Sequence, residues 1–420
     1  MIHALPEDVQ MSLFDPLTLP NGSIIPNRIA KAAMEENMAD AQHVPSEALF
    51  ELYRAWAQGG VGLLITGNVM VDRRAMTGPA GVVLEDDTQL DPFKRWAQIG
   101  RAHGAQFWMQ INHPGRQMQA NLGQATWAPS AVPLALGNLS KRFAIPQEMT
   151  DAVIAEVIAR FVRTAQLAEQ AGLSGVQIHA AHGYLLSQFL SPLTNQRTDQ
   201  WGGSLENRAR LLLEIVKAVR MVVAPTFVVA VKLNSADFQR GGFSVDDAKR
   251  VVQLLNHADV DVVELSGGSY EAPAMQGEAR DGRTLAREAY FVEFAQEIGQ
   301  VAQMPIMVTG GIRRHVVAEQ VIQAGVDLVG MATALAIVPD LPNQWRQGQD
   351  PAPALEPITW KNKVLASLAN MAMVKFQLVK LSKNKPTHPQ VSPARALRLQ
   401  QIATVCQTRQ YRRWMQQLMG

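Results

Sequence analysis

The chain has 420 residues, of which 47% are hydrophobic and 18% charged, so it can bury a large core and is not intrinsically disordered. A single cysteine, Cys406, excludes an intramolecular disulfide, a four-thiolate iron–sulfur cluster and a cysteine-rich zinc site. No unbroken apolar run of ~18 residues predicts a membrane span, and the first ten residues lack the features of a signal peptide. We therefore expect a cytoplasmic protein.

The net charge of +2 conceals an uneven distribution. Residues 361–420 contain 11 Lys or Arg and no Asp or Glu, which leaves 28 basic against 37 acidic residues in the first 360. A basic tail on an acidic body can mark contact with an anionic partner or surface. Nucleic-acid binding is not expected, because no recognition module accompanies the charge.

The predicted elements begin with a β-hairpin over residues 17–25, which has Asn21-Gly22 at its turn. After it, eight short apolar runs alternate with seven amphipathic patterns of helical period. The runs predict strands near residues 28–34, 61–66, 106–110, 175–178, 227–232, 260–265, 305–308 and 327–331. The amphipathic patterns predict helices over residues 46–58, 89–103, 150–171, 204–223, 244–257, 287–301 and 313–324.

This alternation predicts the α/β class and, within it, a (β/α)8 TIM barrel over residues 1–350, with the hairpin covering its bottom. A doubly wound sheet is the competing architecture, but the chain has neither its G-x-G-x-x-G fingerprint nor a P-loop. We expect residues 351–420 to form a basic, helical extension.

Chemistry in a barrel is expected at the carboxyl ends of the strands. The fourth predicted strand is followed there by His179, His182 and Tyr184. Three interpretations stay open: the imidazoles bind a metal, they donate hydrogen bonds to a substrate oxygen beside a proton-donating phenol, or the side chains only stabilise the turn. A metal site would require further ligands at other strand ends, and no convincing set is present.

Other polar groups and glycines lie at the same rim. Gln110 and Lys232 end the third and fifth strands, and Gly310-Gly311 follows the seventh. Glycines after strands seven and eight are typical of barrels that bind phosphate through backbone N–H groups, although Gly-Gly alone is weak evidence.

Taken together, these segments resemble the Old Yellow Enzyme family of FMN-dependent NAD(P)H:flavin oxidoreductases. The strongest match is HAAHGYLLSQFLSPLTNQRTDQWGGSLENRARLL over residues 179–212. Further matches follow the family order, and the resemblance covers roughly residues 12–348. They are LPNGSIIPNRI (19–29), QINHPGR (110–116), ELSGGSYE (264–271) and VTGGI (308–312).

The resemblance implies a role for each matching position. His179 and His182 would hold the carbonyl oxygen of an α,β-unsaturated substrate, and Tyr184 would donate the proton. Glu35 and Tyr270 would face the substrate pocket. The residues that would contact FMN are Ala33, Met34 and Gly67 at the ring, Gln110 and Lys232 at its pyrimidine edge, and Gly310, Gly311, Ala332 and Thr333 at the phosphate.

Three departures from the family pattern stand out. Ala332-Thr333 replaces a Gly-Arg pair whose arginine contacts the phosphate, and Arg313 is a candidate substitute. Glu35 replaces a Thr or Cys near the flavin, which we expect to alter the redox potential. The chain also lacks the cysteine-rich segment and the nucleotide domains of larger members.

The resemblance implies an enzyme that reduces activated C=C bonds of enones or similar small electrophiles, by ping-pong hydride transfer from NADH or NADPH through FMN. A metal-dependent barrel hydrolase and a non-catalytic flavin-binding protein remain alternatives. In the tail, Leu365, Leu368, Ala372, Phe376 and Val379 predict one apolar helical face. Docking on the barrel, or on a second subunit of a homo-oligomer, is preferred over contact with anionic lipid.

Overall fold

The computed structural model describes residues 11–274, 289 and 291–419. Eight parallel strands form a closed barrel in which each strand pairs with its successor and the last pairs with the first. The strands are β3 (Ile29–Lys31), β4 (Leu63–Ile65), β7 (Gln106–Asn112), β10 (Gly175–Ala180), β11 (Val228–Asn234), β12 (Val262–Ser266), β13 (Ile306–Thr309) and β14 (Leu328–Met331). The predicted eight-stranded barrel is confirmed.

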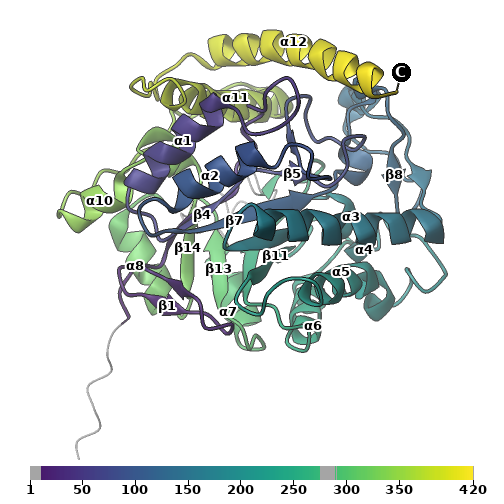
Figure 1. The fold of residues 1–420 in the computed structure, drawn as a ribbon, viewed down its shortest axis with the longest axis horizontal. Helices are drawn as coiled ribbons and strands as arrows, with labels where there is room; N and C mark the ends of the chain where they lie inside the picture. The colour runs from purple at the N-terminus through teal and green to yellow at the C-terminus, as the bar shows by residue number, and fades with distance from the viewer. Residues whose placement is uncertain (1–10, 275–288, 290, 420) are drawn as a thin grey trace, which may run out of the picture.

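Seven helices alternate with these strands around the barrel, as predicted (Figure 1). They are α1 (Glu47–Gln58), α2 (Asp91–Arg101), α3 (Asp151–Gln170), α5 (Leu205–Arg220), α6 (Val245–Leu255), α7 (Val292–Gly299) and α8 (His315–Gln323). Hydroxyl side chains cap several N-termini; Thr150 accepts from the Val153 amide and Ser204 from the Asn207 amide. The helix expected over residues 287–301 starts at Val292 in the structure, and residues 287, 288 and 290 lie outside the described residues.

Shorter elements fill the loops at the carboxyl ends of the strands and around the barrel. They are β5 (Val69–Met70), β6 (Val82–Val83), β8 (Trp127–Ala128), β9 (Gln147–Glu148), α4 (Leu185–Leu190), α9 (Thr333–Ile337), α10 (Leu341–Arg346) and the 3-10 turns η1 (Gly115–Gln117), η2 (Ala120–Leu122) and η3 (Gly137–Arg142). The strand pair β5–β6 extends β7 beside the barrel, which the apolar pattern did not predict.

The predicted hairpin forms from β1 (Leu17–Thr18) and β2 (Ile24–Ile25), with Gly22 at φ +82° in its turn. Leu17, Leu19 and Ile25 are buried in one apolar cluster with inward-facing residues of the barrel strands. The Asn21 amide donates to the Thr226 carbonyl at 3.1 Å, just before β11 begins. The hairpin therefore closes the amino-terminal end of the barrel, and its chemistry is left to the opposite end.

The extension forms two helices, α11 (Lys363–Leu381) and α12 (Pro393–Met419), which pack on each other. Contacts with α1 and α9 hold α11 against the barrel, and α12 runs over it at the top of Figure 1. The predicted apolar face of α11 is only partly correct, because Leu365 and Val379 are 42% and 41% exposed. Of the predicted face Ala372 is buried, and the small residues Ala366 and Ala369, which the prediction did not include, are buried as well and permit close approach.

By length and composition alone, α11 could cross a membrane: Val364–Leu381 has a mean hydropathy of 1.3. The sequence prediction counted only unbroken apolar runs, and Lys375 and Lys380 interrupt this one, so the absence of a membrane span stays a prediction. In the structure, 39% of that window is buried inside the protein, and buried helices of soluble proteins meet the same criterion.

Candidate active site

Five polar side chains form a layer inside the barrel, above its apolar interior. Along each strand, side chains that face the barrel interior alternate with side chains that face outward. Every member of the layer lies two residues after an inward-facing residue, so it also faces inward. The members are Gln110 (β7), Gln177 (β10), Lys232 (β11), Glu264 (β12) and Thr309 (β13). We call this set the polar layer. It joins five neighbouring strands at the end where barrel chemistry is expected.

Glu264 is the centre of the polar layer and is fully buried. Its carboxylate accepts hydrogen bonds from Gln177 Nε2, Lys232 Nζ and Thr309 Oγ1, each at 2.7 Å. Gln110 Nε2 in turn donates to Gln177 Oε1 at 2.7 Å. The carboxylate thus fixes the positions of both residues predicted at the pyrimidine edge of the flavin, Lys232 directly and Gln110 through Gln177.

The sequence predicted Gln110 and Lys232 but not Gln177, Glu264 or Thr309. A signal was present, because each of the three follows a small or apolar inward-facing residue by two positions, Gln177 and Glu264 within a predicted strand and Thr309 directly after one. Gly330 on β14 shows how closely this layer is packed, since a Cβ there would lie 2.0 Å from Thr309 Oγ1.

His179, His182 and Tyr184 meet at the carboxyl end of β10. The ring centroids of His179 and His182 are 5.1 Å apart, and those of His179 and Tyr184 are 4.9 Å apart. His182 adopts φ +61° and Gly183 φ +74°, so the chain turns sharply enough to bring all three rings together.

Each imidazole has a partner that orients it. His179 Nδ1 accepts from the Ala181 amide at 3.2 Å, which leaves the ring hydrogen on Nε2. His182 Nε2 lies 2.7 Å from Ser266 Oγ, and the His182 amide donates to Asn234 Oδ1 at 3.0 Å. When the Ser266 hydroxyl donates to Nε2, the hydrogen of His182 is on Nδ1. Each ring then carries one N–H donor.

Burial determines the protonation of these groups. It lowers the pKa of His179 well below its usual value, and His182 and Lys232 lower it further. Burial, with a contribution from Lys232, also lowers the pKa of His182 well below the usual range. Burial raises the pKa of Tyr184 well above its usual value, assisted by Tyr270 and Glu35. At neutral pH the site therefore holds two neutral imidazoles and a protonated phenol.

Tyr270, one of the two predicted pocket residues, lies beside Tyr184, and the charge of the other, Glu35, acts on both phenols. The hydroxyls of Tyr184 and Tyr270 are 3.2 Å apart. Burial raises the pKa of Tyr270, and the charge of Glu35 raises it further. Glu35 Oε1 accepts from the Thr77 hydroxyl at 2.6 Å. Asn68, which the sequence did not suggest, interacts with Tyr184, and its buried Oδ1 has no hydrogen-bond partner within the described residues.

The predicted ring-lining residues follow β3 and β4. Ala33 packs against the apolar interior of the barrel, and Met34 is buried. A Cβ on Gly67 would lie 2.1 Å from both the Met34 carbonyl and Glu36 Oε2, so this position requires glycine. Beneath them, on the outer side of the barrel wall, Lys31, Glu36 and Tyr53 form a buried cluster.

The predicted phosphate contacts lie on two adjacent loops, because β13 and β14 pair directly. Gly310 is buried and Gly311 adopts φ +78°, which suits a close approach of the backbone to a ligand. Ala332 and Thr333 lie where α9 begins, and Ala332 packs on the same apolar interior as Ala33. Arg313 is half-buried in the loop after Gly311.

The metal interpretation finds no support in the part of the chain that the structure describes. No group of three His, Cys, Asp or Glu side chains there could hold an ion. The two imidazoles also have other partners, the Ala181 amide and the Ser266 hydroxyl. They are therefore available as hydrogen-bond donors.

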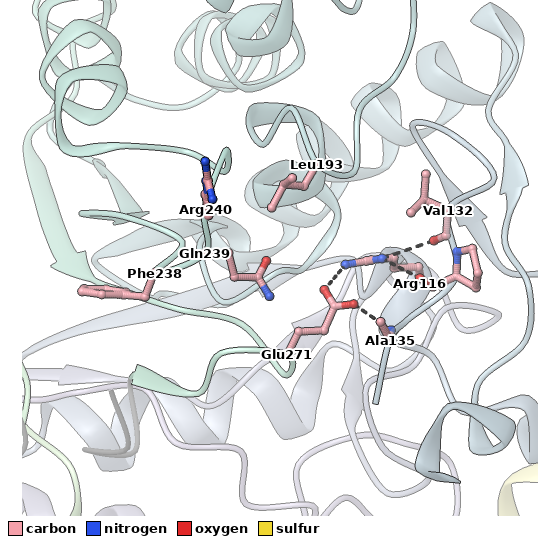
Figure 2. A pocket seen from close by; sticks show the side chains of 9 residues that line it. Arg116, Val132, Ala135, Leu193, Phe238, Gln239, Arg240 and Glu271 are labelled. Atoms are coloured by element: carbon pink, nitrogen blue, oxygen red, sulfur yellow. Dashed lines mark hydrogen bonds and ion pairs between the residues drawn. The ribbon is translucent and has the colours of Figure 1, made fainter. Parts of the chain in front are cut away.

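A pocket of about 560 Å³ lies next to this site, beside the loop that carries Tyr270 (Figure 2). Figure 2 shows the Glu271 carboxylate joined to both Arg116 and Ala135; it accepts from Arg116 Nη2 at 2.5 Å and from the Ala135 amide at 2.7 Å. Arg116 also donates to the Pro133 carbonyl at 2.9 Å. The ion pair joins the loop after β12 to the segment after β7 and so fixes Tyr270, which precedes Glu271.

The donor set of the barrel mouth fits FMN. Lys232 offers a cation and Gln110 an amide at one side, and a glycine at position 67 permits close approach of a flat ring. The loops of Gly310, Gly311, Ala332 and Thr333 lie next to each other, as a phosphate site requires. The buried Asn68 Oδ1 that lacks a described partner is a further polar atom available to a ligand.

Comparison with known proteins agrees with this site. The NADH:flavin oxidoreductase / NADH oxidase family matches residues 12–351. The NADH-dependent flavin oxidoreductase iliE of Hypocrea jecorina (strain QM6a) is 36% identical over 349 residues, covering 78% of this chain and 87% of the relative. The protein of that name from Neonectria sp. (strain DH2) is 38% identical over 352 residues, but this chain spans only 46% of its length.

Solved structures show the same fold. Morphinone reductase matches with a TM-score of 0.69 and 25% identity, covering 83% of this chain and 92% of that one. The Old Yellow Enzyme homologue from Zymomonas mobilis has a TM-score of 0.70 and 24% identity over 85% of this chain and 99% of the other, which supports the fold alone. The chain therefore belongs to the NADH:flavin oxidoreductase / NADH oxidase family, and it is an FMN-dependent oxidoreductase.

Proposed function

We propose that this protein reduces the activated C=C bond of α,β-unsaturated carbonyl compounds with electrons from NADH or NADPH. The supporting observation is the arrangement at the end of β10, where two neutral imidazoles lie beside a protonated phenol. This combination suits a substrate that develops negative charge on an oxygen and needs a proton on carbon. A relative that the chain resembles is named morphinone reductase.

The two imidazoles bind and polarise the substrate carbonyl in this proposal. Bound FMN would accept hydride from the nicotinamide and supply hydride to the substrate β-carbon. His179 Nε2–H and the ring N–H of His182 donate to the carbonyl oxygen, which gains charge as the double bond is reduced. Because both imidazoles are neutral, their hydrogen bonds to the carbonyl oxygen strengthen as that oxygen gains negative charge in the transition state. A positively charged imidazolium would also bind the substrate tightly before the reaction.

Tyr184 completes the reduction by giving its proton to the α-carbon. Its raised pKa keeps the phenol protonated at neutral pH, and the Tyr270 hydroxyl 3.2 Å away can stabilise the phenolate that remains. The nicotinamide and the enone would use the same opening in turn, because the sequence contains no dinucleotide fingerprint. We therefore expect ping-pong kinetics.

The proposal is tested by separating the two half-reactions in Tyr184→Phe. Purified wild-type protein should show a bound-flavin absorption spectrum and should be reduced by NADH or NADPH in a stopped-flow experiment. In Tyr184→Phe we expect flavin reduction within about twofold of wild type, while reoxidation by 2-cyclohexenone slows by about 10²-fold or more.

The matched control is Tyr270→Phe, which removes the neighbouring hydroxyl but leaves the proposed donor. Its reoxidation rate should fall far less than that of Tyr184→Phe. Equal losses in both half-reactions of Tyr184→Phe would contradict the assigned role, and a wild-type flavin that NADH reduces but no enone reoxidises would contradict the proposed function.

A further inference from the structure

The C-terminal extension contacts the barrel at the mouth that holds the proposed site. Residues 352–420 lie beyond the part of the chain that matches the family. From α11, Lys375 Nζ donates to the side-chain amide oxygen of Asn37. From α12, Gln407 Nε2 donates to the Asn37 carbonyl at 3.2 Å. Both helices thus hold one residue of the loop after β3, only two positions beyond Glu35.

Asn37 passes this contact on to Glu35. With its amide oxygen toward Lys375, the Asn37 amide nitrogen donates to Glu35 Oε1 at 3.3 Å. Asn37 adopts φ +54°, a left-handed conformation that asparagine tolerates better than most residues. Lys375, Asn37 and Glu35 therefore form a continuous polar chain from the extension to the pocket carboxylate.

The extension also packs on the second support of Glu35. Thr77, which donates to Glu35 Oε1 at 2.6 Å, lies in the loop between β5 and β6. The neighbouring residue Met76 is buried in one cluster with Tyr411 and Met415 of α12. A Cβ at Gly78 would lie 3.0 Å from Glu35 Oε1, so this loop closely surrounds the carboxylate.

Only one oxygen of Glu35 is used by these contacts. Oε1 accepts from both Thr77 and Asn37, whereas Oε2 has no hydrogen-bond partner within the described residues, and the side chain is only half-buried. The loop that carries Glu35 packs on the loop that carries Asn68, because a Cβ at Gly67 would lie 2.1 Å from the Met34 carbonyl. Asn68 interacts with Tyr184, and the charge of Glu35 raises the pKa of both Tyr184 and Tyr270. An acceptor with an open oxygen therefore lies on the loop next to the one that contacts the proposed proton donor.

We propose that Glu35 selects substrates that carry a hydroxyl or ammonium group near the reducible bond, and that the extension positions Glu35 through Lys375 and Asn37. This inference rests on the proposed function, because it assigns a substrate class to the same pocket. A hydrogen bond from a ligand donor to a carboxylate is charge-assisted and directional, and its strength depends on how firmly the acceptor is held. Glu35 is the specificity-determining residue and Lys375 the positioning residue.

The test measures binding without turnover. FMN-loaded, oxidised full-length protein is titrated, with no NADH present, with 2-cyclohexenone and with its 4-, 5- and 6-hydroxy derivatives, and Kd is read from the change in flavin absorbance. We expect wild type to bind at least one hydroxylated ring about tenfold more tightly than the parent ring. Glu35→Gln should reduce this preference to within about twofold.

Variants of the extension test the positioning role. Lys375→Met should lose about threefold or more of the preference, and Lys375→Arg, which can still donate to Asn37, should retain it. Lys383→Met is the matched control, because Lys383 is exposed on the same extension, so the charge change is identical. Thermal unfolding of each variant checks that the extension stays folded.

The inference is overturned if wild type shows no preference for any hydroxylated ring, or if Lys375→Met retains the full preference. Turnover decides the proposed function separately. A protein that binds the hydroxylated ring tightly but reduces neither ketone after its flavin is reduced by NADH would contradict enone reduction and still support the binding role of Glu35.

Discussion

Two buried lysine–glutamate pairs lie on opposite sides of the barrel wall, and they differ in their surroundings. Lys232 and Glu264 face inward and are 2.7 Å apart, with side chains 4% and 0% exposed. Lys31 and Glu36 face outward toward α1 and are 3.3 Å apart, with side chains 0% and 7% exposed. The two lysine–glutamate pairs are therefore about equally buried, although they face opposite sides of the barrel wall.

The outer pair is surrounded by aromatic rings and backbone. Lys31 Nζ donates to the Tyr53 hydroxyl at 3.0 Å and to the Ile65 carbonyl at 2.8 Å, and lies 4.5 Å from the Trp56 ring centroid. The Tyr53 hydroxyl also accepts from the Gly67 amide at 3.1 Å. These contacts hold the loops of Met34 and Gly67 from the outer side of the barrel wall.

The inner pair instead belongs to the polar layer, which lies toward the carboxyl ends of the barrel strands. Glu264 holds Lys232, which is the cation expected at the pyrimidine edge of FMN. The comparison indicates that the outer pair positions backbone, while the inner pair sets charge next to a ligand. The following predictions separate these roles, from the largest expected effect to the smallest.

Removing the carboxylate of Glu264, the acid of the inner pair, should cause the largest loss in the free energy of unfolding. Glu264→Leu leaves the Lys232 ammonium, the Gln177 amide and the Thr309 hydroxyl without their acceptor inside the barrel. We expect a loss of about 3–5 kcal/mol in the free energy of unfolding, measured by urea denaturation, together with poor retention of FMN. A loss below about 1 kcal/mol would show that the layer relaxes and that Glu264 is not its centre.

The outer pair, Lys31 and Glu36, should make the free energy of unfolding depend on pH. Burial lowers the pKa of Lys31 to about 8, although Glu36 opposes the shift. Because the ordinary value is 10.5, the unfolded chain holds more protons between these two values, so the free energy of unfolding should rise with pH across that interval. This contribution is fully present above pH 10.5 and is lost as the pH falls through 8, with a total on the order of 3 kcal/mol.

The double variant Lys31→Met/Glu36→Leu supplies the reference for this measurement. Replacing both partners of a buried pair is often close to neutral, so the variant should fold and bind FMN. Urea denaturation at pH 7.5, 9 and 10.5 should show the wild-type stability rising relative to the variant. A constant difference across these three values would contradict the buried, partly deprotonated lysine.

Charge next to the flavin should appear in the redox potential. Glu264→Gln keeps an acceptor in the layer but removes the charge that balances Lys232, so anionic reduced flavin should become easier to form. We expect the midpoint potential to rise by a few tens of millivolts, where ~30 mV corresponds to about 1.4 kcal/mol for two electrons. Glu36→Gln on the outer side is the control, and an equal shift there would remove the distinction between the pairs.

The smallest effect should come from a single neutral hydrogen bond. Thr309→Val keeps the shape of the side chain but removes the donor to Glu264. We expect a loss of about 1 kcal/mol in the free energy of unfolding, and Thr309→Ser should recover most of it. No recovery in the serine variant would assign the effect to packing instead of the hydrogen bond.

The sequence was most informative where one local pattern decides the structure. The apolar runs and the alternating amphipathic patterns predicted all eight barrel strands and their order, because buried parallel strands and surface helices differ in period. The hairpin of Asn21-Gly22 also forms and plugs the barrel interior as expected. The first and last residues of the helices were predicted less accurately, because capping residues locate a helix end only to within about one turn.

The site was predicted less completely. The motif over residues 179–212 identified His179, His182 and Tyr184, and the structure brings their rings together. Identifying the hydrogen-bond partners of Glu264 requires the register between neighbouring strands, and a single sequence does not determine that register. The chain from Lys375 to Glu35 could not be foreseen at all, because it depends on how two helices at the end of the chain dock on a loop near its beginning.

The pairing of β3 with β14 has a consequence for how the molecule is made. Ile29 and Val329 are partners across this seam, so the cylinder cannot close until the eighth strand has left the ribosome. Until then β3 has an unpaired edge, which is prone to association with other nascent chains. Ala33 and Ala332 lie on the two sides of this seam, so the flavin pocket is completed only in the last stage of folding.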